Sequence, residues 1–120
     1  MPNGYTSSKQ ILTSQAATNP VQISPTFSTG NYSGGYLQPG IIVNLSSGAT
    51  ITYNVEVTGD DVSAPNYATS TQTWTPFTGM AGLTASTVGT LGAQVSAIRV
   101  NCTSYGSGTL TFFFVQASIP

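Results

Sequence analysis

Residues 95–117 read VSAIRVNCTSYGSGTLTFFFVQA, and they carry the clearest structural signal in the chain. Apolar and polar residues alternate in the first half of this stretch, which is typical of a β-strand with one buried face. The segment Ser104–Gly108 then supplies two glycines, which suit a turn with positive φ angles. The stretch therefore predicts a β-hairpin made of strands 95–103 and 109–117.

The second of these strands is apolar on both faces. Leu110, Phe112 and Phe114 share one face, and Phe113 and Val115 share the other. One face can enter a hydrophobic core, but the other then needs a cover. We expect that cover to be either the N-terminal segment of this chain or a neighbouring subunit.

The rest of the chain has the same β character. Residues 49–58 alternate between apolar and polar positions, and no stretch repeats apolar residues at helical spacing for three turns. We expect an all-β, single-domain antiparallel β-sandwich, jelly-roll-like, at residues 21–120, with an extended N-terminal arm at residues 1–20. The strands expected before the hairpin are Val21–Ser28, Ile41–Leu45, Ala49–Thr58, Thr73–Phe77 and a weak one near Leu83–Val88.

Charge is almost absent from this sequence. Charged residues make up 4% of the 120 residues, histidine is absent and the formal net charge is −1, whereas a typical soluble domain is roughly 25% charged. Without a basic patch we expect no nucleic-acid partner. No apolar run approaches membrane-spanning length, so we expect no membrane partner either.

Three of the charged residues, Glu56, Asp60 and Asp61, lie close together in the sequence. Clustered carboxylates can bind Ca²⁺, but Asp side chains at the end of a strand more often accept hydrogen bonds from free backbone N–H groups of a turn. We favour the turn and assign no metal or cofactor. Arg99 has few other acidic partners in the chain, so we expect a structural ion pair between Arg99 and Asp60 or Asp61.

Cys102 shares a strand face with Ile98 and Val100, and we expect it to be a small buried side chain. Because the chain has no histidine, Cys102 has no imidazole base, and neither a Ser-His-Asp triad nor a histidine metal site can form. We therefore expect no enzymatic activity. Trp74 is expected in the core between the sheets, whereas the loop tyrosines Tyr32 and Tyr36 suit an interface.

Three motifs resemble a known family. ITYNVEVTGDD at residues 51–61, the Thr73-Trp74 pair, and the stretch from Val95 to Gln116 are similar to segments of small β-sandwich virion proteins of tailed bacteriophages. The likeness covers roughly the last 70 residues, and the stretch from Val95 is its most specific part. Members of this group look like capsid decoration (cement) proteins, which bind the assembled head and stabilise it.

The resemblance implies a structural protein on the capsid exterior of a virion, bound to the major capsid protein as a homo-oligomer, with a trimer preferred over a dimer. An alternative is a head-fibre or tail module that binds a host glycan through Trp74 and the tyrosines; a hydrolase using Glu56 and Asp60 is the weakest. The residues expected to contact the capsid or a sister subunit are Ile11, Leu12, Tyr32, Tyr36, Phe113 and Val115.

Overall fold

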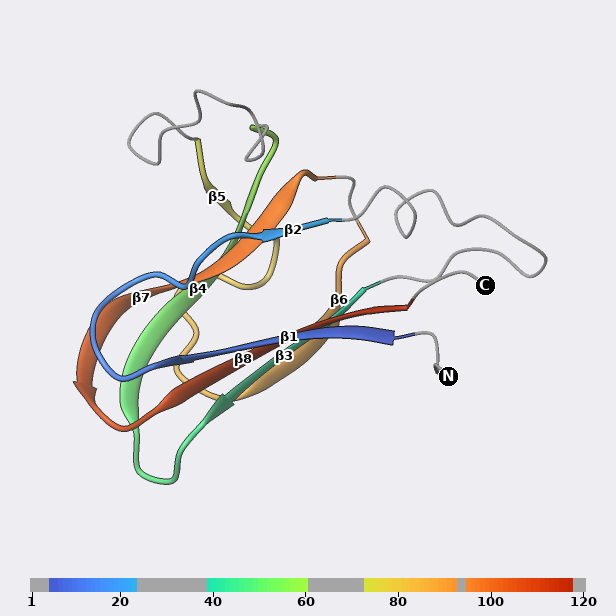
Figure 1. Cartoon of the computed structure of the whole chain (residues 1–120). Helices are drawn as coiled ribbons and strands as arrows, with labels where there is room; N and C mark the ends of the chain where they lie inside the picture. The colour runs from blue at the N-terminus through green and yellow to red at the C-terminus, as the bar shows by residue number, and fades with distance from the viewer. Residues whose placement is uncertain (1–4, 24–38, 61–72, 93–94, 118–120) are drawn as a thin grey trace.

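The structure, a computed structural model, describes residues 5–23, 39–60, 73–92 and 95–117 (Figure 1). All regular secondary structure in these residues is β-strand, and they include no helix long and apolar enough to cross a membrane. The strands are β1 (Tyr5–Leu12), β2 (Val21–Gln22), β3 (Gly40–Leu45), β4 (Thr50–Thr58), β5 (Thr75–Pro76), β6 (Thr87–Thr90), β7 (Ala97–Ser107) and β8 (Leu110–Ala117).

These strands form two four-stranded sheets, which appear as two layers in Figure 1. The first sheet has the order β1-β8-β3-β6 and the second the order β2-β7-β4-β5. Every neighbouring pair is antiparallel. The expected all-β antiparallel sandwich is therefore confirmed.

The hydrophobic core lies between the two sheets and draws on the inward positions of both. Alternation along each central strand places every second side chain in this layer, so that Phe112 and Phe114 of the first sheet and Tyr53 and Val55 of the second belong to one core cluster. Cys102 is 2% exposed, as expected for a small buried side chain. The fully buried large side chains are Tyr53, Phe112, Phe114, Ile41, Ile98, Leu110, Val43, Val55, Val100 and Cys102.

The predicted hairpin between the last two strands is wrong. β7 pairs with β2 and β4 in the second sheet, whereas β8 pairs with β1 and β3 in the first. The chain therefore crosses from one sheet to the other between Ser107 and Leu110. A neighbouring crossing, from β3 to β4, is joined to it at Ser46, whose N–H donates to the Thr109 carbonyl (2.9 Å) and whose hydroxyl accepts from the Thr109 N–H (2.9 Å).

Two glycines explain why the chain crosses here. A Cβ at Gly106 would collide with the hydroxyl of Thr50, so this glycine lets β7 stay paired with β4 beyond the point where the hairpin turn was expected. Gly108 has φ = 103°, and a Cβ on it would lie 2.8 Å from the Cα of Ala49. Only glycine tolerates both the angle and the close approach. The glycines serve a sheet-to-sheet crossing rather than a hairpin.

The N-terminal segment contributes to both sheets over its described part. β1 pairs with β8 along its whole length, in the register Tyr5↔Ala117 to Leu12↔Leu110. Residues 16–23 then follow β7 at the edge of the second sheet, with Thr18 N–H donating to the Val100 carbonyl (2.9 Å). β1 therefore lies beside β8 within the first sheet, and this pairing does not cover the outer face of β8.

The remaining strand predictions differ from the structure mainly in their boundaries. β3 and β4 agree with the expected strands to within one residue. The weak strand expected near 83–88 lies further along as β6, while Leu83 makes only an isolated bridge with Tyr53. β5 and β2 are shorter than expected, and residues 24–28 of the strand expected at Val21–Ser28 lie outside the described residues.

Candidate interaction surfaces

The outer face of the second sheet holds a buried ion pair. Glu56 on β4 lies directly opposite Arg99 on β7 in the strand register. Arg99 donates from Nε (2.9 Å) and from a terminal nitrogen (2.8 Å) to the same oxygen, Glu56 Oε1. The Glu56 side chain is 8% exposed and that of Arg99 is 17% exposed, so the pair is largely shielded from solvent.

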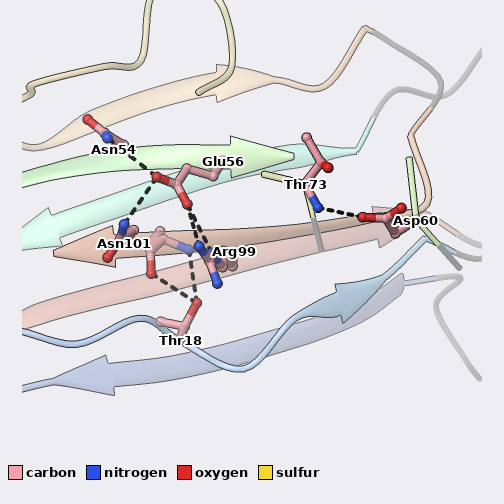
Figure 2. Close-up of polar contacts among 8 residues, drawn as sticks. Thr18, Asn54, Glu56, Asp60, Thr73, Arg99 and Asn101 are labelled. Atoms are coloured by element: carbon pink, nitrogen blue, oxygen red, sulfur yellow. Dashed lines mark hydrogen bonds and ion pairs between the residues drawn. The ribbon is translucent and has the colours of Figure 1, made fainter. Parts of the chain in front are cut away.

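The second oxygen of Glu56 is also occupied (Figure 2). Glu56 Oε2 accepts from Nδ2 of Asn101 at 3.1 Å and from Nδ2 of Asn54 at 3.4 Å. Because both oxygens of this buried carboxylate have donors, its desolvation is compensated. This polar cluster ties β4 to β7 on the outer face of the second sheet.

Arg99 therefore has a different ion-pair partner from the one expected. The strand register places it opposite Glu56, and the sequence alone does not give that register. Asp60 instead accepts from the N–H of Thr73 (2.6 Å) and from the Thr58 hydroxyl (3.2 Å), while its own N–H donates to Thr58 Oγ1 (3.0 Å). Asp60 thus accepts from a backbone N–H, as in the role that we favoured, but this N–H lies thirteen residues further along the chain rather than in a local turn. Asp61 lies outside the described residues.

Trp74 is not in the core, contrary to our prediction. It is partly exposed, and the guanidinium carbon of Arg99 lies 4.3 Å from its ring centroid. This is a cation–π distance. Trp74 precedes β5, which pairs with β4 at Glu56 and Val57, and this short strand brings the indole to the outer face of the second sheet.

Sequence reasoning missed most of this polar cluster, although a signal was available. Asn54 and Glu56 are two residues apart on one strand, and Arg99 and Asn101 are two residues apart on another. Each pair must share a face of its strand. Two such pairs of amide and charged side chains, each on one face of its strand, indicate a matched cluster, provided that the strands are neighbours. No group of three or more His, Cys, Asp or Glu residues gathers in the described part of the chain.

The outer face of the first sheet carries the other expected contact residues. Ile11 is 56% exposed, and Phe113 and Val115 are partly exposed. Leu12 points the other way and packs against the core. The structure thus brings Ile11, Phe113 and Val115 to one face and places Leu12 elsewhere. Tyr32 and Tyr36 lie outside the described residues.

Tyr53 places a phenol group in the hydrophobic core between the two sheets. Its ring is fully buried, and its hydroxyl donates to the Ala85 carbonyl at 2.7 Å. Burial raises the pKa of Tyr53 from 10.0 to about 12 because it disfavours the phenolate. Tyr53 is therefore a structural anchor for the segment before β6.

These features define the molecule as an all-β antiparallel sandwich. The outer face of the second sheet carries the polar cluster, and the outer face of the first sheet carries the apolar side chains of Ile11, Phe113 and Val115. Comparison of the chain with protein-family models, with curated proteins and with solved structures finds no match.

Proposed function

We propose that this chain is a structural virion protein that decorates and stabilises the capsid of a tailed bacteriophage. It would bind the major capsid protein on the capsid exterior as a homo-oligomer. The observation that carries the proposal is the outer face of the first sheet, where partly or largely exposed apolar side chains lie on strands with a single charged residue, Lys9. Such a face favours contact with protein over contact with water.

The strand pairing adds support. β1 pairs with β8, β2 with β7, β3 with β6 and β4 with β5. We infer from these nested pairs, which alternate between the two sheets, that the sandwich is a jelly roll, an architecture that occurs in viral capsid domains. Fold alone does not give function, so this argument is secondary to the apolar face and to the motif resemblance.

The charged residues with described side chains also fit a structural role. Glu56 and Arg99 neutralise each other within the polar cluster, and Asp60 holds the backbone of Thr73. The glycan-binding alternative uses Trp74 and the loop tyrosines. Arg99 lies over one face of the Trp74 ring, so that face is not free for a sugar. The observations therefore favour decoration over glycan binding.

The test uses heads of the encoding phage prepared without this protein. Purified chain is added, the heads are sedimented, and bound protein and the temperature of DNA release are measured. We expect saturable binding, a higher release temperature and new density on the capsid exterior by cryo-electron microscopy. Absence of binding to the heads would refute the proposal.

Two matched variants test whether the outer face of the first sheet contacts the phage head. Phe113→Asp places a charge on the outer face of the first sheet, and Ser47→Asp places the same charge on an exposed turn between β3 and β4. We expect Phe113→Asp to lower occupancy at least ~10-fold, because each 1.4 kcal/mol lost from binding changes affinity tenfold. Ser47→Asp should bind as the unmodified chain does.

A further inference from the structure

β1 contributes little to the hydrophobic core. It lies at the end of the first sheet and pairs with β8 alone. None of the side chains at residues 7–12 is fully buried; Leu12 packs against the core only in part, and Ile11 is 56% exposed. Backbone hydrogen bonds to β8 therefore supply most of what holds β1 in place.

The segment that follows, residues 16–23, is fixed by buried side chains. Thr18 is 5% exposed and Ile23 is 8% exposed. Thr18 also makes a two-way contact with β7, because its N–H donates to the Val100 carbonyl (2.9 Å) and its hydroxyl accepts from the Val100 N–H (2.9 Å). This segment therefore stays on the second sheet unless the core itself opens.

Two features separate β1 from the fixed segment. Residues 13–15 between them are all exposed, so they can change conformation without opening the core. Gln10 of β1 reaches across to Asn19, where its Nε2 donates to the Asn19 carbonyl (2.9 Å) and its Oε1 accepts from the Asn19 N–H (2.8 Å). These two hydrogen bonds are exposed, so water can replace them at little cost.

We propose that β1 opens from β8 as a separate unit while residues 16–23 stay on β7 and the sandwich stays folded. The open form is a minor population, because the closed form keeps the eight-residue pairing with β8 and the partial burial of Leu12. Opening leaves the fully buried side chains of both sheets in place, so it costs less free energy than global unfolding. The inference goes beyond the proposed function and does not depend on it.

The closed strand covers the edge of β8, although not its outer face. Residues 110–115 of β8 read LTFFFV, which is apolar on both faces and carries no charge. A strand of this kind with a free edge pairs readily with other chains. β1 is mostly polar and carries Lys9, which suits an edge strand better. β1 thus acts as a strap over β8, and each opening uncovers that edge.

Hydrogen exchange of the free full-length chain, followed by NMR for each backbone amide, tests the proposal. The amides that pair β1 with β8 should exchange at least ~10-fold faster than those that pair β4 with β7, and faster than those of Thr18 and Ile23. Urea below the unfolding transition should speed the β4–β7 amides but change the β1–β8 amides little. The reason is that the urea dependence grows with the surface that an opening exposes.

Two core variants give a second measurement of the same property. Leu12→Ala removes the core contact of β1, whereas Val55→Ala removes a buried contact on β4 in the other sheet. Leu12→Ala should speed exchange of the β1–β8 amides at least ~10-fold. Val55→Ala should speed the β4–β7 amides at least ~10-fold and the β1–β8 amides less than ~2-fold. Circular dichroism spectra check that both variants are folded.

Three results would overturn the proposal. Equal rates and equal urea dependence for the two sets of amides in the unmodified chain would mean that β1 is released only by global unfolding, and this comparison needs no variant. A Val55→Ala effect as large on the β1–β8 amides as on the β4–β7 amides would mean the same. Exchange of Thr18 and Ile23 as fast as that of β1 would show that the opening extends beyond β1.

Discussion

At the scale of single residues, the stability of the polar cluster depends on Arg99. A buried carboxylate is costly unless it is paired and hydrogen-bonded. Arg99 supplies the only positive charge within ion-pair distance of Glu56 among the described residues, and it also packs on Trp74. Loss of Arg99 leaves the amides of Asn54 and Asn101 to solvate the charge alone.

We predict that Arg99→Met lowers the free energy of unfolding by about 2–3 kcal/mol, somewhat less than the 3–5 kcal/mol typical of a fully buried pair. Urea denaturation at micromolar protein concentration measures it. The double variant Glu56→Gln/Arg99→Met should recover most of the loss, since no buried charge remains unpaired. Lys9→Met is the control, because exposed charges contribute little. An Arg99→Met effect no larger than that of the control would contradict the prediction.

Tyr53 makes the stability of the folded chain depend on pH in the alkaline range. Its pKa is about 12 in the folded chain and 10.0 in the reference state, so between these values the unfolded chain loses a proton that the folded chain keeps. The stability contributed by burying the neutral phenol is complete below pH 10 and is lost as the pH rises towards 12, by up to about 1.4 kcal/mol per unit.

Urea denaturation at pH 9, 10, 11 and 12 measures this loss. Tyr53→Phe cannot ionise, so its stability should fall less steeply over this range. It should also be about 1 kcal/mol less stable at pH 8, since the carbonyl of Ala85 loses its hydrogen bond. Parallel pH profiles for the two proteins would show that Tyr53 does not titrate as expected.

At the scale of elements, β1 behaves as a strand of the sandwich with an inner and an outer face. Leu12 packs against the core, whereas its neighbour Ile11 is 56% exposed. We predict that Leu12→Ala costs about 2 kcal/mol, the low end for a buried leucine because Leu12 is only partly buried. Ile11→Ala should cost less than about 0.5 kcal/mol. Equal effects in thermal unfolding at micromolar protein would mean that β1 is released from β8 in solution.

The sequence predicts the faces of individual strands but not which strands pair with each other. Alternation fixed the faces of β4 and β8 correctly, because a side chain's side of a strand depends only on its position along that strand. The strand with which each strand pairs does not follow from alternation. β7 and β8 are joined by few residues and look like a hairpin, yet β7 pairs with β4 as far as Ser107 and β8 belongs to the other sheet, with Gly108 at the crossing in a conformation and a close approach that suit glycine.

The same limit applies to the candidate site. Arg99 was correctly expected in an ion pair, but the choice among acidic residues depends on the register between β4 and β7, which only packing determines. Trp74 was misplaced because its position follows from the pairing of the short strand β5 with β4. By contrast, the outward and partly exposed positions of Phe113 and Val115 followed directly from alternation along β8.

At the scale of the whole molecule, the oligomer and the capsid contact that we propose would have to rely on apolar burial and neutral hydrogen bonds. Five charged residues in 120 create almost no long-range field, and Lys9 is the single charged residue in the four strands of the first sheet. Electrostatic steering and ionic contacts are therefore minor, and apolar burial supplies most of the free energy of association.

We predict that self-association and occupancy on phage heads change less than about threefold between 50 mM and 1 M NaCl, because screening acts only on charges. Sodium sulfate should strengthen both, since excluded salts favour apolar burial. Sedimentation velocity and head co-sedimentation across the two salt series measure this, and heads without added protein control for damage by salt. If raising NaCl dissociated the homo-oligomer or stripped the heads, ionic contacts would hold the assembly, and the apolar outer face of the first sheet would not be its basis.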